Sequence, residues 1–275
     1  MLELSANIEY MFLDREFVDR IDAVAELDVP AFEFGVWLEH DVPTITERTR
    51  RHGLTVANIS VDPKIRLLDS DESAALAAAV RATSDTARQL GCRQLGLLVE
   101  EVKDEPGRPW FDYQRSDRER DERRRQRDNI VRALKSVAPI AEGEGMLLLV
   151  ECLNTLVDHA DYFIASWQEG VSIAREVDSP ALGLTFDAYH HQVNEGNLIS
   201  SLTQDIDLVH HIHIADVPGR HEPGTGEINF LNLLRAAKRA GYDGYLGLEC
   251  VPTKRDVGAA LAPIRQIVDQ VNRED

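Results

Sequence analysis

The chain has 275 residues and a formal net charge of -18 at pH 7, with 43% hydrophobic and 6% aromatic residues. This composition is ordinary for a globular protein with a sizeable core, and the length suits two small domains or one large α/β barrel. The excess of carboxylates repels nucleic-acid phosphates, so DNA and RNA are not expected as partners.

The N-terminal segment MLELSANIEYMF lacks the basic stretch, apolar run and small-residue cleavage site of a signal peptide. The chain also contains no run of about 18 uncharged apolar residues. We therefore expect this segment to be a first strand, the protein to be cytoplasmic and no membrane to be a partner. The cysteines, Cys92, Cys152 and Cys250, are odd in number and widely spaced, which argues against a disulfide framework or a structural zinc site.

Short apolar, β-branched runs alternate with amphipathic helical patterns along the whole chain, and several of these patterns end in glycine, a common helix stop. Eight strands, each followed by a helix, predict a parallel sheet. A single (β/α)8 TIM barrel spanning 1–275 is its natural closure. An open doubly wound sheet is the alternative, weakened because no GxGxxG follows the first strand. The predicted strands are 2–7, 31–36, 54–60, 94–99, 146–151, 181–187, 208–215 and 245–250.

One long charged insertion, residues 100–129, follows the fourth predicted strand. Its second half has the alternating charges of a solvated helix with i,i+4 ion pairs. Its first half contains PGRPWFDY, which we expect either to continue this surface or to form an ordered loop over the mouth of the barrel.

Potential metal ligands stand at the ends of four consecutive predicted strands. In a parallel barrel the carboxyl ends of the strands form the functional rim. Three carboxylates and one imidazole there suit a divalent cation such as Mn²⁺ or Mg²⁺, with open positions for substrate oxygens. A strand-end acid is more often a helix cap, and for Asp187 alone that alternative is favoured. Together the set predicts a metal site formed by Glu151, Asp187, His213 and Glu249.

Side-chain alternation along a strand sorts the neighbours of these residues. If the two glutamates point into the barrel, Cys152 and Cys250 point towards the helices and are packing residues. On the seventh strand His213 is nearest the rim, whereas His211 lies one layer deeper and is expected to be a core histidine. His210 is expected to face outwards.

Two further residues lie beside the predicted metal site. His190 follows Asp187 by three residues, and Arg220 lies in the loop that leaves the seventh strand. Arginine binds carboxylates and other oxyanions in a bidentate manner. Because both residues lie next to the predicted metal site, we expect both side chains to bind substrate. The alternatives are a loop histidine and a surface arginine.

Six segments resemble the hydroxypyruvate isomerase family, which belongs to the xylose isomerase-like TIM barrels. The resemblance covers essentially the whole chain, and the RHEP…GEIN signature is its most specific part. The segments are IADVPGRHEPGTGEINF, FDAYHHQVNEGNL, LLLVECLN, GYDGYLGLEC, SANIEYMF and FEFGVW.

This resemblance implies the same four metal ligands, with Glu151 and Glu249 also acting as the proton-transfer pair and with His190 and Arg220 holding and polarising the substrate. One departure concerns His213, because hydroxypyruvate isomerases often have glutamine there, whereas ketose 3-epimerases usually have histidine. The long segment after the fourth strand also differs.

The implied reaction converts hydroxypyruvate to tartronate semialdehyde through an enediolate. The alternatives within the fold are a ketose 3-epimerase and an inositol-pathway isomerase or dehydratase. A non-catalytic sugar-binding barrel would not need paired acids, and an endonuclease IV-like enzyme would need more histidines and a basic face. A small hydroxy-oxo-acid or sugar is thus the expected partner, and the sequence leaves a homo-oligomer open.

Overall fold

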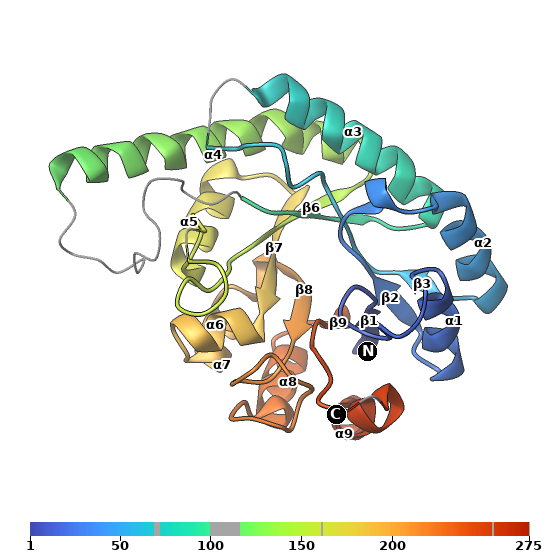
Figure 1. The fold of residues 1–275 in the computed structure, drawn as a ribbon. Coiled ribbons are helices and arrows are strands. Elements are labelled where there is room, and N and C mark those ends of the chain that lie inside the picture. The colour runs from blue at the N-terminus through green and yellow to red at the C-terminus, as the bar shows by residue number, and fades with distance from the viewer. Residues whose placement is uncertain (69–71, 100–115, 161, 255, 275) are drawn as a thin grey trace.

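The computed structural model describes residues 1–68, 72–99, 116–160, 162–254 and 256–274. Within them, parallel strands form one sheet that curves into a barrel, and the helices lie around its outside (Figure 1). The strands follow one another in the order β3-β2-β1-β9-β8-β7-β6-β5-β4. The predicted TIM barrel is therefore confirmed.

The third predicted strand, 54–60, is split into two short strands. Its first part, β3 (Thr55–Val56), pairs with β2, and its second part, β4 (Ile59–Ser60), pairs with β5. Because β3 and β4 are the two ends of the sheet order and adjoin in the chain, this segment closes the barrel.

The other strands lie within the predicted runs. They are β1 (Glu3–Asn7), β2 (Ala31–Glu33), β5 (Gln94–Leu97), β6 (Leu147–Glu151), β7 (Leu182–Asp187), β8 (Val209–Ile214) and β9 (Tyr245–Leu248). The α-helices are α1 (Asp19–Glu26), α2 (Val42–His52), α3 (Ser73–Leu90), α4 (Asp117–Glu144), α5 (Trp167–Val177), α6 (Ala188–Asn194), α7 (Leu198–Gln204), α8 (Phe230–Arg239) and α9 (Val257–Arg273). Two short helices, α6 and α7, follow β7 where one was predicted.

The ends of α4 show how local sequence sets a helix. Ser116 and Glu119 form a reciprocal capping box at its start, which satisfies backbone N–H groups that no helical carbonyl reaches. Gly145 ends it in the left-handed conformation, with φ of 70°, which costs least for glycine. The predicted glycine stop after α3 is also present, at Gly91.

The charged segment contributes the first turns of α4, which extend past α5 (Figure 1). Arg120 pairs with Asp117, and Arg124 pairs with Asp121, at i,i+3 spacing on an exposed face. Such exposed pairs add little stability. The proposed loop PGRPWFDY lies outside the described residues.

The two ends of the described chain meet beside β1. The side chain of Asn272 in α9 accepts a hydrogen bond from Leu2 N at 3.0 Å and donates one to Leu2 O at 2.8 Å. This contact fixes the last helix against the first strand. None of the helices in the described part of the chain has the length and apolar character needed to cross a membrane.

Candidate metal centre and active site

The four residues predicted as metal ligands meet at one end of the barrel. Glu151 ends β6, Asp187 ends β7, His213 lies in β8, and Glu249 follows directly after β9. Each offers a ligand atom, and these atoms all lie within 4.8 Å of one another. The parallel register brings them to this level, since Asp187 is the direct partner of His213 across β7 and β8.

The imidazole of His213 is the centre of this cluster. Its Nδ1 lies 2.9 Å from Glu151 Oε1 and 3.5 Å from Glu249 Oε2. The carboxylate of Asp187 is slightly farther, with Oδ2 at 3.8 Å from the same nitrogen. One ring nitrogen therefore faces all three carboxylates.

Asp187 combines the two roles that its sequence position left open. Its Oδ1 accepts a hydrogen bond from His190 N at 2.9 Å and so caps α6. Its Oδ2 remains on the side of the cluster, 3.8 Å from His213 Nδ1. The capping hydrogen bond fixes the orientation of the carboxylate. Because Oδ1 is bound to the backbone of α6, Oδ2 is held on the side of the cluster.

Burial and repulsion dominate the electrostatics of the cluster. Burial, together with the charges of Glu151 and Asp187, raises the pKa of Glu249 to about 7 despite His213 and Arg220. Burial lowers the pKa of the His213 imidazole, but the carboxylates of Glu249, Glu151 and Glu33 outweigh it and raise that pKa well above its usual value. The cluster therefore stabilises positive charge at its centre.

This donor set fits a divalent cation. Three carboxylates and one imidazole converge in a largely buried place, where excess negative charge is costly without a compensating cation. Carboxylate oxygens and imidazole nitrogen are ligands that Mg²⁺, Mn²⁺ and related ions accept. Glu151, Asp187, His213 and Glu249 would hold the ion.

Arg220 lies at the rim of this cluster, in the loop after β8. Its Nη2 donates to Glu249 Oε2, and its Nε donates to Glu249 O at 3.4 Å. The guanidinium lies 4.8 Å from the ring centre of Tyr10 and 5.4 Å from that of Tyr189. Burial alone would lower the pKa of Arg220, but the carboxylates of Glu249 and Asp187 together have the larger effect and raise that pKa above its usual value. The guanidinium is therefore permanently charged.

The loop that carries Arg220 is organised by Asp216, which was not among the predicted site residues. Asp216 is fully buried and accepts hydrogen bonds from four backbone N–H groups at 2.8–3.0 Å. A side chain at Gly226 would meet Val217 O at 2.0 Å, so only glycine fits this tight turn. The donors belong to Val217, Gly224, Gly226 and Ile228.

His190, the other predicted substrate-binding residue, is 1% exposed. Its Nδ1 accepts from Asn154 N at 3.1 Å and lies 2.7 Å from Asn154 Nδ2. The proton of a neutral ring then sits on Nε2, which has no hydrogen-bond partner among the described residues. Burial lowers the pKa of His190, which favours the neutral ring, and Nε2 lies 3.9 Å from Asp187 Oδ2.

A cavity of about 170 Å³ opens onto three of the four clustered residues. Glu151, His213 and Glu249 form part of its wall. Its remaining described polar lining comes from Asn7, Glu9, Tyr10, Glu33, Asn58, Ser60 and Thr185. Asn7 also donates to Glu249 Oε1 at 3.3 Å, which helps to fix that carboxylate.

The structure also adds Glu33, at the end of β2, to the neighbourhood of His213. The rule used for the other strands, an acid at the strand end, would have found it. The predicted strand 31–36 placed it in the middle of a strand, however, and so hid it. His211 is fully buried, as expected of a core residue, and the Sγ of Cys152 lies beside Gly170 of α5, on the helix side as predicted.

Comparison with known proteins agrees with this geometry. A family model described as xylose isomerase-like TIM barrel matches residues 21–267. The chain belongs to this family. The 2-oxo-tetronate isomerase of Cupriavidus necator is 30% identical over 259 residues, which cover 92% of this chain and 94% of that one. The hydroxypyruvate isomerase of Escherichia coli is 27% identical, over 92% and 94% of the two chains.

Solved structures agree in fold. A crystal structure described as an AP endonuclease, family 2, from Brucella melitensis superposes with a TM-score of 0.86 and 25% identity, covering 97% of this chain and 99% of that one. The chain is thus an isomerase of the hydroxypyruvate and 2-oxo-tetronate isomerase family, and the resemblance drawn from its motifs is confirmed.

Proposed function

We propose that this isomerase acts on a small 2-oxo acid bearing a neighbouring hydroxyl group, with hydroxypyruvate as the first candidate and 2-oxo-tetronate as the second. The observation that supports this most directly is the convergence of Glu151, Asp187, His213 and Glu249 beside the permanent cation Arg220. A bound Mn²⁺ or Mg²⁺ would supply positive charge where the substrate's oxygens become negative.

Glu151 and Glu249 form the proton-transfer pair in this proposal. One carboxylate removes a proton from the carbon that bears the hydroxyl group, and the electron pair forms an enediolate. The other glutamate, protonated, returns a proton to the former carbonyl carbon, while the hydroxyl proton passes to the former carbonyl oxygen. One C–H bond breaks and one forms, so no oxidant is needed. Hydroxypyruvate would yield tartronate semialdehyde.

Arg220 and His190 hold the substrate. Arg220 would bind the substrate's carboxylate, and the Nε2–H of His190, which has no hydrogen-bond acceptor among the described residues, would donate to an oxygen of the enediolate. Tyr10 and Tyr189, whose rings flank the guanidinium, keep it from swinging into solvent.

A second candidate is a ketose 3-epimerase, in which the proton returns to the opposite face of the same carbon. It is favoured by the described cavity lining, where Glu9, Asn58 and Ser60 offer hydrogen bonds to neutral hydroxyl groups. The histidine at 213 also fits this reading.

The test is proton exchange in deuterated water with the Mn²⁺- or Mg²⁺-loaded protein. Hydroxypyruvate, 2-oxo-tetronate and a panel of ketoses are each followed by NMR. We expect deuterium to enter an oxo acid and the carbonyl to move to the neighbouring carbon. Exchange confined to C3 of a ketose would establish the epimerase instead, and no exchange in any substrate would refute both.

A further inference from the structure

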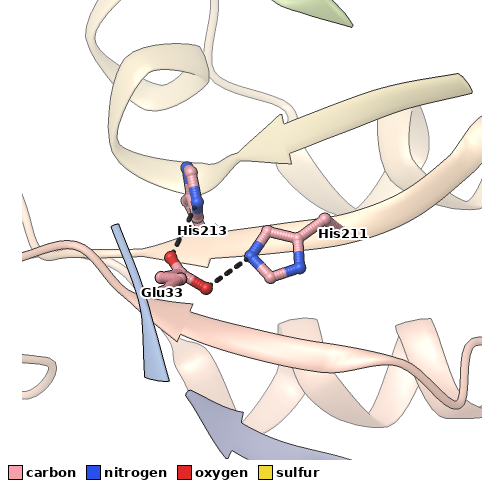
Figure 2. A group of neighbouring side chains, drawn as sticks. All are labelled: Glu33, His211 and His213. Carbon is pink, nitrogen blue, oxygen red and sulfur yellow. Dashed lines mark ion pairs between the residues drawn. The ribbon is translucent and has the colours of Figure 1, made fainter. Parts of the chain in front are cut away.

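The two nitrogens of His213 face different partners. Nδ1 faces the carboxylates of the candidate metal centre, and Nε2 lies 3.0 Å from Glu33 Oε1. The other oxygen of the same carboxylate lies 2.9 Å from His211 Nε2. Figure 2 shows Glu33 lying between the two imidazoles and in contact with both.

Glu33 comes from a distant strand. It lies on β2, and β1 and β9 separate β2 from β8 in the sheet order. Its carboxylate therefore reaches His213 through the interior of the barrel. Its register partner among the described residues is Asn7 of β1.

Gly247 of β9 makes this reach possible. It is the register partner of His213. A Cβ atom there would lie 2.3 Å from Glu33 Oε1, 2.7 Å from His213 Cδ2 and 2.8 Å from His211 Nε2. Real Cβ atoms do not approach so closely, so the three side chains occupy the space that a side chain at 247 would need.

The three side chains are 0–6% exposed, so water does not compete for their contacts. A buried carboxylate is stable only when donors or cations compensate it. Each oxygen of Glu33 faces one ring nitrogen, so the two imidazoles are the groups that compensate this buried carboxylate.

We propose that Glu33 is the positioning residue for the metal centre: it holds the proton of His213 on Nε2 and thereby leaves the Nδ1 lone pair directed at the cation. An imidazole that binds a cation through Nδ1 has no proton there, so its one N–H is on Nε2 and the tautomer is fixed. Carboxylates that accept from the far nitrogen of a ligating histidine raise its basicity and orient its ring. His211 holds the second oxygen of Glu33 and so prevents the carboxylate from turning.

The test measures Mn²⁺ affinity by calorimetry after chelator treatment, and it rests on the metal centre of the proposed function. Loss of such a carboxylate weakens metal binding roughly 10–100-fold, so we expect this for Glu33→Gln. Gly247→Ala keeps every donor and acceptor but displaces the carboxylate, and it should weaken binding as well. The matched control is Asp205→Asn. Asp205 is a buried carboxylate that accepts a hydrogen bond from Trp167, and it belongs neither to the candidate metal centre nor to the group of Glu33, His211 and His213. The Mn²⁺ affinity of this variant should be unchanged.

A folded Glu33→Gln protein that binds Mn²⁺ as tightly as the wild type would overturn the proposal and leave the metal centre standing. Wild-type protein that binds no Mn²⁺ would overturn both. A second measurement uses the wild-type protein alone and needs no stable Glu33 variant. With Zn²⁺ bound, nitrogen-15 NMR of the histidine rings, assigned with His213→Gln, should show the His213 proton on Nε2. A proton on Nδ1 would refute the inference.

Discussion

Arg220 and Glu249 form an ion pair across 29 positions of sequence, with Nη2 of the arginine donating to Oε2 of the glutamate. The pair joins the loop after β8 to the end of β9. It places a permanent cation on a carboxylate that would both bind metal and transfer a proton. A substitution of either residue should therefore alter the position and the pKa of the other side chain.

Glu249→Gln should abolish solvent exchange while the fold is retained. Glutamine keeps the shape and the hydrogen bond from Arg220, but it cannot accept or return a proton at neutral pH. We expect exchange to fall by at least ~10²-fold, the usual contribution of general acid–base catalysis. The measurement is deuterium uptake by NMR, with circular dichroism as the check on folding. A variant with wild-type exchange would remove Glu249 from the proton-transfer pair.

Arg220→Gln should raise KM for hydroxypyruvate more than it lowers kcat. Charged hydrogen bonds contribute about 1.5–3 kcal/mol, which corresponds to roughly a 10–100-fold change. Neutral ketoses serve as the control, because they have no carboxylate for the guanidinium to bind. Equal losses for acids and ketoses would show that Arg220 acts mainly by holding Glu249.

Asp216→Asn should destabilise the protein and loosen the Arg220 loop. One carboxylate oxygen becomes an NH₂ group that cannot accept from Gly224 N and Gly226 N, so two backbone N–H groups lose their acceptor. A hydrogen bond contributes about 0.5–1.5 kcal/mol net to stability. Denaturant unfolding gives the free energy. Asp41→Asn is the control, since this exposed N-cap aspartate is replaced by an equally good cap, and its unfolding free energy should not change.

Acidification should destabilise the protein through His191. Burial lowers the pKa of this ring to about 4, whereas the unfolded chain has a value near 6.5. Above about pH 6.5 both states are neutral and no stability is lost. As the pH falls towards 4 the unfolded state binds the proton first, so stability decreases, by up to about 3 kcal/mol.

The comparison of wild type with His191→Leu isolates this contribution, because leucine does not titrate and suits the aromatic contacts with Phe186 and Trp167. The free energy of unfolding is measured at intervals between pH 7 and pH 4. The difference in unfolding free energy between the two proteins should change in favour of the variant by up to about 3 kcal/mol as the pH falls. Parallel curves would mean that His191 is protonated equally well in the folded state.

Metal binding should itself stabilise the fold. A ligand that binds only the folded state adds about 2.7 kcal/mol at a concentration of 100 times its Kd. We therefore expect Mn²⁺ to raise the Tm of the chelator-treated protein and to leave that of Asp187→Asn much less affected, since this change removes a charged ligand from the cluster. Equal rises would indicate that the ion binds elsewhere.

The sequence by itself determined the barrel and one rim of it. Apolar runs of strand length alternating with helical patterns require parallel strands, and parallel strands bring their carboxyl ends to the same edge. That is why Glu151, Asp187, His213 and Glu249, each at or next to a strand end, could be grouped from their positions in the chain alone.

Only the tertiary structure decided which other residues contact these four ligands or organise the loops around them. Glu33 meets His213 because the curvature of the sheet brings β2 within reach of β8 across β1 and β9, and Gly247 leaves room for the contact. Nothing local in the sequence encodes a contact through the barrel interior between two residues so far apart in the chain. The burial that makes His190 neutral and the four bonds of Asp216 likewise depend on how separate loops pack. Strand register is a local periodic property, whereas these contacts follow from closure of the whole sheet.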